Sequence, residues 1–140
     1  MIPSFLLKRL FRQFGYDVVG FDPRFSLAAR KQSLIRFAEF DTFVDVGANI
    51  GQFACLLRKY GFQGKIHSIE PGSNAFAKLV RNCENDPNWF AYQFACGCSQ
   101  EQRELFISEN SHSSSLLPNS RLNLKYHPDT KIIDREVVDI

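Results

Sequence analysis

One stretch decides the fold: Val44-Asp45-Val46-Gly47-Ala48-Asn49-Ile50-Gly51-Gln52-Phe53. It continues a short, β-branched and nearly continuous apolar run that begins at Thr42, which predicts a strand buried on both faces and stopping at Gly47. Apolar residues at helical spacing follow, and they predict a helix that ends at Gly61; they are Phe53, Leu56, Leu57 and Tyr60. The chain therefore passes from a strand through a glycine-containing turn into a helix.

The same alternation continues downstream. Lys65 to Glu70 is expected to form a second strand, closed by Pro71-Gly72, and Trp89 to Ala95 a third. Between them lies a second helical stripe, made of Phe76, Leu79, Val80 and Cys83. Strands and helices that alternate with short connections are typical of a parallel sheet with crossover helices. The sequence therefore predicts an α/β fold, with half of a doubly wound parallel sheet.

The residues before this alternation predict two helices. The first is short and amphipathic, with basic residues opposite an apolar stripe of Leu7, Leu10, Phe11 and Phe14. Such a helix can pack on a partner or lie on a membrane surface; packing is favoured, because Lys8, Arg9 and Arg12 are few cations for a stable anchor. A second helix is expected from Leu27 to Phe40. We expect residues 1–40 to form a helical cap and residues 41–140 the α/β domain.

The character of the chain changes after Gly97. Glu104 to Ser108 and Glu136 to Ile140 predict two further strands, paired as an added antiparallel ribbon. A long polar segment rich in Ser, Asn and Pro separates them. Segments of this kind are usually binding loops or disordered, and the sequence leaves both open.

Composition narrows the classes of function. The chain has 140 residues, with 17 Lys and Arg against 15 Asp and Glu, a balance that does not indicate a nucleic-acid partner. No run approaches the roughly 18 apolar residues of a membrane span, and the N-terminus lacks the pattern of a secretory signal. Cys96-Gly97-Cys98 lacks the spacing of redox or zinc sites, and the three histidines are scattered. We expect a cytosolic protein without a metal site.

The turn after the first strand predicts a nucleoside pocket. Gly47 and Gly51 remove side chains where a ligand must approach the backbone, and Glu70 ends the next strand, where doubly wound folds place an acid that binds ribose hydroxyls. A P-loop is excluded because no Gly-Lys-Ser/Thr follows, and Asn49 replaces the second glycine of the dinucleotide pattern. Asp45 and Asn49 offer polar groups for an amino-acid moiety. S-adenosylmethionine combines such a moiety with adenosine.

These residues also resemble a known family, the FkbM-like S-adenosylmethionine-dependent methyltransferases. The likeness covers roughly Phe37 to Ile140 and includes four segments: Val44 to Phe53, Ile69-Glu70-Pro71, Ala95-Cys96-Gly97 and the serine-rich Asn110 to Leu117. It implies a Rossmann-like class I methyltransferase fold and O-methylation of a sugar, polyketide or similar small-molecule hydroxyl.

The resemblance also implies roles for individual residues. The methionine part of the donor would lie against Asp45, Gly47, Ala48, Asn49 and Gly51. Glu70, beside Pro71, would bind the ribose, and Ala95 with Cys96 would border the adenine. Ser113, Ser114 and Ser115 are candidates for contact with the substrate, because loops at such positions often carry function. No general base and no acceptor can be assigned.

The family pattern continues with a strand that reads approximately Leu-Lys-Ile-Asp-x-Glu-Gly, and this sequence stops at Ile140 before it. We therefore expect the N-terminal part of a methyltransferase domain, apparently truncated, whose exposed first strand would pair with a second copy or a partner chain.

Three alternatives stay open at this point. The chain can be a methyltransferase, a truncated or degenerate domain that binds the donor or a partner without catalysis, or a nicotinamide-dependent oxidoreductase. Asn49 disfavours the last of these. Each site residue also has a structural interpretation, since Asp45 can be a buried acid satisfied by nearby amides and Glu70 an exposed acid in an ordinary turn.

Overall fold

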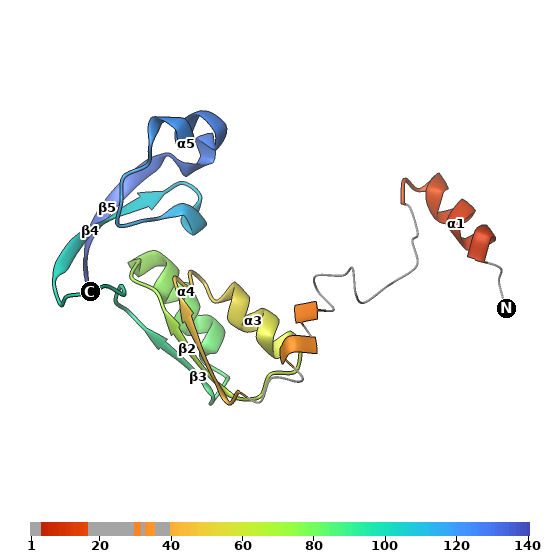
Figure 1. The fold of residues 1–140 in the computed structure, drawn as a ribbon, viewed down its shortest axis with the longest axis horizontal. Helices are drawn as coiled ribbons and strands as arrows, with labels where there is room; N and C mark the ends of the chain where they lie inside the picture. The colour runs from red at the N-terminus through yellow and green to blue at the C-terminus, as the bar shows by residue number, and fades with distance from the viewer. Residues whose placement is uncertain (1–3, 17–29, 32, 36–39) are drawn as a thin grey trace. The chain divides into compact units, whose positions relative to one another are not determined.

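The computed structural model describes residues 4–16, 30–31, 33–35 and 40–140, and the chain divides into two compact units, Met1–Leu34 and Ile35–Ile140 (Figure 1). In the first unit, α1 (Ser4–Gln13) is the predicted amphipathic helix. The second predicted helix, Leu27 to Phe40, falls partly outside the described residues; residues 30–31 and 33–35 are helical and Phe40 is not. None of the helices in the described residues is long and apolar enough to cross a membrane.

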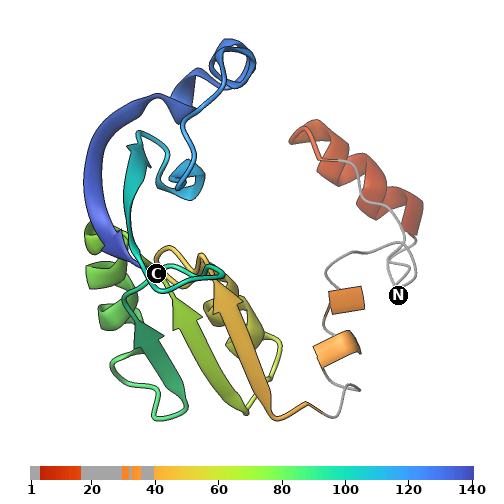
Figure 2. The same cartoon turned by 60° about the vertical axis from the view of Figure 1, so that its left-hand side comes forward.

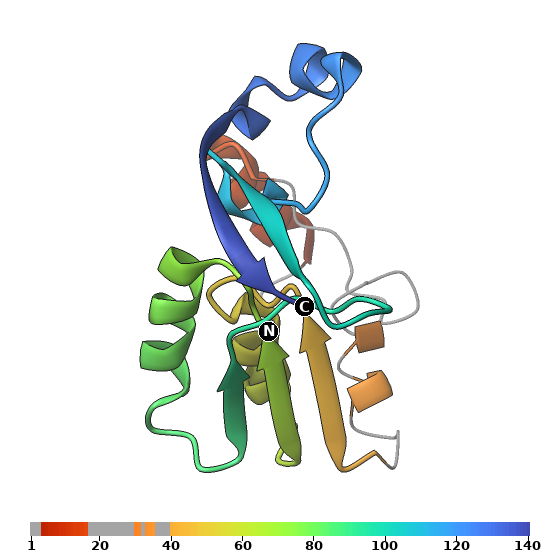
Figure 3. The same ribbon diagram turned by 90° about the vertical axis from the view of Figure 1, so that its left-hand side faces the viewer.

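The second unit is built on a three-stranded parallel sheet. Its strands are β1 (Thr42–Val46), β2 (Lys65–Ile69) and β3 (Trp89–Tyr92), in the spatial order β1-β2-β3. Helix α3 (Gln52–Lys59) connects the first pair and α4 (Ser73–Cys83) the second. The predicted alternation of strands and helices is confirmed, except that β3 ends at Tyr92 instead of Ala95. Figure 3 shows the three strands side by side, with their carboxyl ends at one edge.

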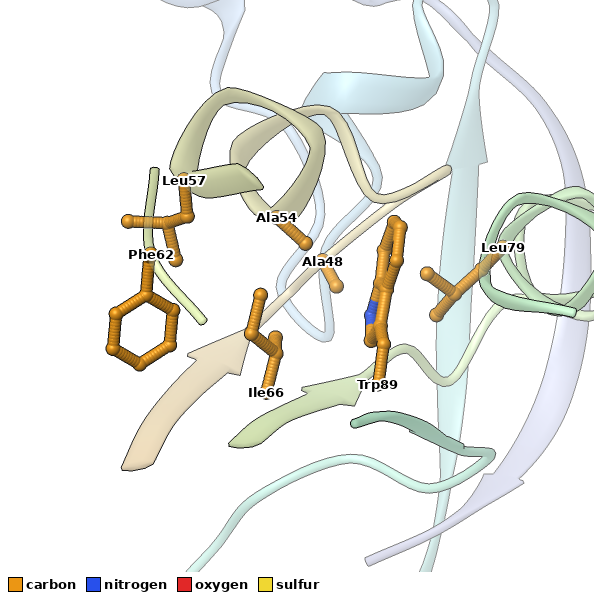
Figure 4. Packing of buried hydrophobic residues seen from close by; sticks show 7 residues of the cluster. All are labelled: Ala48, Ala54, Leu57, Phe62, Ile66, Leu79 and Trp89. Atoms are coloured by element: carbon orange, nitrogen blue, oxygen red, sulfur yellow. The ribbon is translucent and has the colours of Figure 1, made fainter. Parts of the chain in front are cut away.

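The main core lies between the sheet and these two helices (Figure 4). Leu57 of α3, Ile66 of β2 and Leu79 of α4 are almost completely buried. The Trp89 ring stands among them, and its indole N–H donates to the Ser68 hydroxyl at 2.9 Å, so the one polar atom of this large side chain is satisfied. Leu57 of the first predicted stripe and Leu79, with Phe76 and Cys83, of the second therefore contribute to this core, whereas Phe53 and Val80 are exposed.

The prediction that β1 is buried on both faces is wrong. Exposure alternates along the strand: Val44 is 56% and Val46 60% exposed, whereas Phe43 and Asp45 are half-buried. Register places Val44 in line with His67 and Phe90 across the sheet. This face, which we call the open face, carries no helix of residues 40–140 because both crossover helices pack on the other side.

The chain ends in an antiparallel ribbon of β4 (Gln102–Ser108) and β5 (Ile132–Asp139), as the sequence predicts. The polar segment between them is ordered into η1 (Ser111–Ser113), α5 (Arg121–Tyr126) and η2 (Pro128–Thr130). Figure 2 shows the ribbon rising beyond the carboxyl ends of the sheet strands. Its own small core contains Ala95, Leu105 and Val138. The Ala95 amide donates to the backbone carbonyl of Asp139 at 2.7 Å. The ribbon and the β1–α3 turn therefore lie at the same edge of the sheet.

Candidate functional site

The turn from β1 into α3 is held by backbone contacts. The amides of Gly47 and Ala48 both donate to the carbonyl of Ile69, at 2.9 and 3.0 Å, which fixes the turn against the end of β2. Gly47, Asn49 and Gly51 all have positive φ, of 75°, 49° and 86°. Asparagine is, after glycine, among the residues that best tolerate this conformation, so Asn49 fits where most side chains would be strained.

Glu70 is fixed at the end of β2, and the residue is 8% exposed. Its Oε2 accepts from the Asn49 amide and its Oε1 from the Gly72 amide, each at 2.8 Å. These two bonds hold the carboxylate between the β1–α3 turn and the residue that precedes α4. An ionised carboxylate offers about four acceptor positions, so each oxygen retains room for one further donor.

The polar segment after β4 folds onto this turn. The Asn49 side chain donates to the Ser111 hydroxyl at 3.0 Å, and the Gln52 amide nitrogen lies 3.2 Å from Nε2 of His112. Two side-chain pairs thus join residues about sixty positions apart and place η1 over the start of α3. Sequence reasoning missed Ser111 and His112; the only local signal is Asn110, whose side chain caps η1 by accepting from the His112 amide.

Two hollows open between the turn and the ribbon. The first, which we call the carboxylate hollow, has a volume of about 150 Å³ and is lined by Gly47, Asn49, Glu70, Pro71, Leu105, Ser111, His112 and Ser114. The second, the apolar hollow, has a volume of about 180 Å³ and is lined by Val46, Gly47, Ile69, Pro71, Phe94, Ala95, Cys96, Leu105, Ser114, Ser115 and Leu116. They share four residues and are therefore neighbours.

Most of the residues singled out from the sequence line these hollows. They are Gly47, Asn49, Glu70, Pro71, Ala95, Cys96, Ser114 and Ser115. Ser114 also has a structural contact, because its hydroxyl accepts from the Ser108 amide at 3.2 Å. Four others lie outside both linings, namely Asp45, Ala48, Gly51 and Ser113.

Asp45 lies on β1 in register with Ser68. Its Oδ2 is buried and has no hydrogen-bond partner among the described residues. Burial raises the pKa of this carboxyl above its ordinary value of 3.8, because the charged form loses hydration without gaining a donor. The interpretation of Asp45 as an acid satisfied by nearby amides is therefore wrong for this oxygen, which is available to an added donor.

Gly51 has a packing role. A Cβ at this position would meet the Trp89 ring at 2.5 Å and Leu79 at 2.8 Å, so only a residue without a side chain lets α3 start this close to the core. A Cβ at Gly47 would meet no atom within 4 Å, although Gly47 lines both hollows. The first glycine leaves open space at the site, and the second lets the protein pack.

Thiols and metal ligands do not gather at this site. The four cysteines are free, and Cys96 and Cys98 are exposed. Across the described part of the chain, no three His, Cys, Asp or Glu side chains are placed to hold a metal ion.

Comparison with known proteins gives limited information. No family model and no curated protein matches the chain. Among solved structures, a Staphylococcus aureus protein assigned as a caffeoyl-CoA O-methyltransferase is similar over 66% of this chain, with 13% sequence identity and a TM-score of 0.42. The chain spans 44% of the length of that protein. At this level the likeness carries no functional inference, so the residues of the site are the basis of the proposal below.

Proposed function

We propose that residues 41–140 form the donor-binding part of an S-adenosylmethionine-dependent methyltransferase of the FkbM-like type, which methylates a hydroxyl of a sugar, polyketide or similar small molecule. One observation carries the proposal. Glu70 is a buried carboxylate, held by the amides of Asn49 and Gly72, on the wall of a hollow that Gly47 also lines. An acid at this strand end, beside a glycine turn, is the arrangement by which doubly wound folds bind a ribose.

The carboxylate hollow suits the polar part of such a donor. Glu70 has acceptor capacity left on both oxygens, which matches two neighbouring ribose hydroxyls. Ligand binding should cost little side-chain entropy at Glu70, because two backbone hydrogen bonds already hold its carboxylate in one orientation. Asp45, on the preceding strand, lies outside both hollows with its Oδ2 buried, so we assign it no direct contact with the methionine moiety.

The apolar hollow suits the adenine. Its walls carry Ile69, Phe94 and Leu105, and the Ala95-Cys96 backbone runs along its edge. Each hollow by itself is smaller than the roughly 300–1,000 Å³ of sites for drug-sized ligands, so a donor of two halves would occupy both. Gly47 lies between them, and its missing Cβ leaves room for the ligand to pass from one to the other.

The sulfonium of the bound donor supplies an electrophilic methyl group, which an acceptor oxygen takes by in-line displacement. The contribution expected of this chain is to hold that donor in one orientation, since near-attack positioning is the main source of acceleration in such reactions. We assign no general base and no acceptor-binding residue.

The test is calorimetric titration of the chain with S-adenosylhomocysteine. Glu70→Ala removes two charge-assisted hydrogen bonds to the ribose and should weaken binding by at least about 100-fold. Glu104→Ala is the matched control, because Glu104 also accepts a hydrogen bond, from Arg135 at 3.3 Å, but does not line any hollow that Glu70 lines. Urea unfolding of both variants separates loss of the site from loss of the fold, and Glu70→Gln serves if Glu70→Ala does not fold.

The outcomes distinguish the alternatives. Binding that Glu70→Ala abolishes and Glu104→Ala retains supports the donor site, and transfer of a labelled methyl group to an acceptor then separates an enzyme from a domain that only binds. Binding of NADH without binding of S-adenosylhomocysteine would contradict the proposal in favour of a nicotinamide enzyme. No binding of either ligand to the folded chain would contradict it as well.

A further inference from the structure

We propose that α1 is an interfacial helix that binds the surface of membranes rich in anionic lipid; the small number of cations favours packing in the sequence, whereas the exposure of the apolar side chains supports the membrane surface. The observation behind this is the apolar stripe of α1, defined as Leu6, Leu7, Leu10, Phe11 and Phe14, all of which are exposed. Leu10 is 52% and Phe14 70% exposed, which is unusual for two large apolar side chains on one short helix. Helical spacing places the stripe on one side of the helix, because residues three and four apart share a face.

Backbone hydrogen bonds close the C-terminal end of α1. The Tyr16 amide donates to the backbone carbonyl of Phe11 and the Gly15 amide to that of Arg12, each at 3.1 Å. Gly15 has a φ of 79°. These two bonds are the pattern of a Schellman motif, which satisfies the last carbonyls of a helix without help from a neighbour. Phe14 is therefore held in a tight turn at the end of the stripe, and Tyr16, also exposed, lies just beyond it.

Charge decides which partner fits. The polar side of α1 carries Lys8 and Arg9, and residues 4–16 contain no Asp or Glu. Helices that lie in the headgroup plane typically carry leucine and phenylalanine on one side and cations without acidic residues on the other. A protein that packs on the stripe needs no complementary charge, whereas an anionic lipid surface attracts Lys8 and Arg9 when the stripe enters it. Its ten residues lie flat on such a surface and do not span it.

Flotation of the full chain with lipid vesicles tests the proposal. The chain should float with phosphatidylcholine vesicles that contain phosphatidylserine, and much less with phosphatidylcholine alone. Lys8→Gln with Arg9→Gln should weaken binding by about 30-fold, since each cation near an anionic surface contributes about a fivefold change. High salt should weaken the binding of the unmodified chain in the same direction.

Two further variants make the test specific. Leu10→Ser with Phe14→Ser removes the centre and the end of the stripe and should abolish flotation. Lys59→Gln with Lys131→Gln is the matched control, because it removes the same charge from exposed positions in residues 35–140 and should leave flotation unchanged. Neither pair touches the two hollows, so binding of S-adenosylhomocysteine should not change.

Three results would overturn the proposal. One is the absence of flotation with phosphatidylserine vesicles at low salt. Another is an equal loss of binding in the Lys59 and Lys131 control, which would indicate a general charge effect. The third is that Leu10→Ser with Phe14→Ser lowers the unfolding midpoint or dissociates an oligomer in sedimentation, because the stripe would then pack against protein.

Discussion

At the scale of single residues, the two glycines of the β1–α3 turn illustrate how one residue type serves two purposes. Gly47 and Gly51 have similar positive φ values of 75° and 86°, so each would strain a residue with a side chain. Their surroundings differ. A Cβ at Gly51 would collide with Trp89 and Leu79, whereas one at Gly47 would meet only the space of the hollows.

This difference predicts that alanine at Gly51 mainly lowers stability, whereas alanine at Gly47 mainly weakens ligand binding. Gly51→Ala combines backbone strain with overpacking and should lower the free energy of unfolding by about 2–4 kcal/mol. Gly47→Ala carries the strain alone, about 1–2 kcal/mol, but should weaken S-adenosylhomocysteine binding because its methyl group stands where the ligand passes. Urea unfolding and calorimetry on both variants check this. Equal destabilisation by the two alanines would contradict the packing role of Gly51.

At the scale of elements, Arg58 ties the crossover connections together. From the last turn of α3 its guanidinium donates to Asp86 at 2.6 Å, beyond the end of α4, and to the carbonyls of Phe62 and Gly64 at 2.8 and 2.9 Å, before β2. Hydrogen bonding to Arg58 lowers the pKa of the Asp86 carboxyl below its ordinary value of 3.8. Both side chains are mostly shielded, at 20% and 24% exposed, so this pair differs from an ordinary surface ion pair.

Removing this arginine should loosen the connections to both β2 and β3. Arg58→Ala removes the guanidinium that donates to the Asp86 carboxylate and to the carbonyls of Phe62, Gly64 and Asn88, and should lower the free energy of unfolding by about 1–3 kcal/mol at neutral pH. Arg103→Ala is the control, since its pair with Glu101 is about half exposed, and should change stability by less than about 0.5 kcal/mol.

The same pair carries a pH dependence with a defined sign. A carboxyl whose folded-state pKa is lowered stabilises the fold above its unfolded pKa and loses this effect as pH falls through the folded value. The stability difference between the unmodified chain and Arg58→Ala should therefore narrow as pH falls below 3.8, measured by urea unfolding at several pH values. A difference that stays constant or widens would show that Asp86 does not contribute.

At the scale of the whole molecule, the sheet of residues 40–140 has one face packed on helices and one open face. Phe43 and Val44 are neighbours in β1 and point to opposite faces, because side chains alternate along a strand. The Phe43 ring lies 5.4 Å from that of Phe53 in the α3 layer, whereas Val44 is exposed on the open face. Stacking of His67 on Phe90, with ring centroids 5.1 Å apart, continues the apolar character of the open face across the sheet.

Lysine at these two neighbouring positions should therefore act very differently. Phe43→Lys places a charge in the helix layer and should cost about 2–4 kcal/mol of stability. Val44→Lys projects its charge into solvent and should change stability by less than about 1 kcal/mol. Thermal or urea unfolding of both variants is the measurement. If Val44→Lys proves as damaging as Phe43→Lys, the open face is packed against protein in solution.

The sequence by itself determined the order of strands and helices, because apolar periodicity is a local property that tertiary contacts rarely reverse. It also placed Gly47, Asn49 and Glu70 at one edge of the sheet, since carboxyl ends of parallel strands meet there. FkbM-like methyl transfer stays a proposal that rests on these residues and on the resemblance.

Tertiary structure alone decided the rest. Burial of β1 on one face depends on which side the crossover helices take, and the contact of Gly51 with Trp89 joins residues far apart in the chain. The pairs Asn49 with Ser111 and Gln52 with His112 likewise connect positions about sixty residues apart. Periodicity records only which side of an element is apolar; it contains no information on which distant polar group will lie opposite, because that depends on the path of the connecting chain.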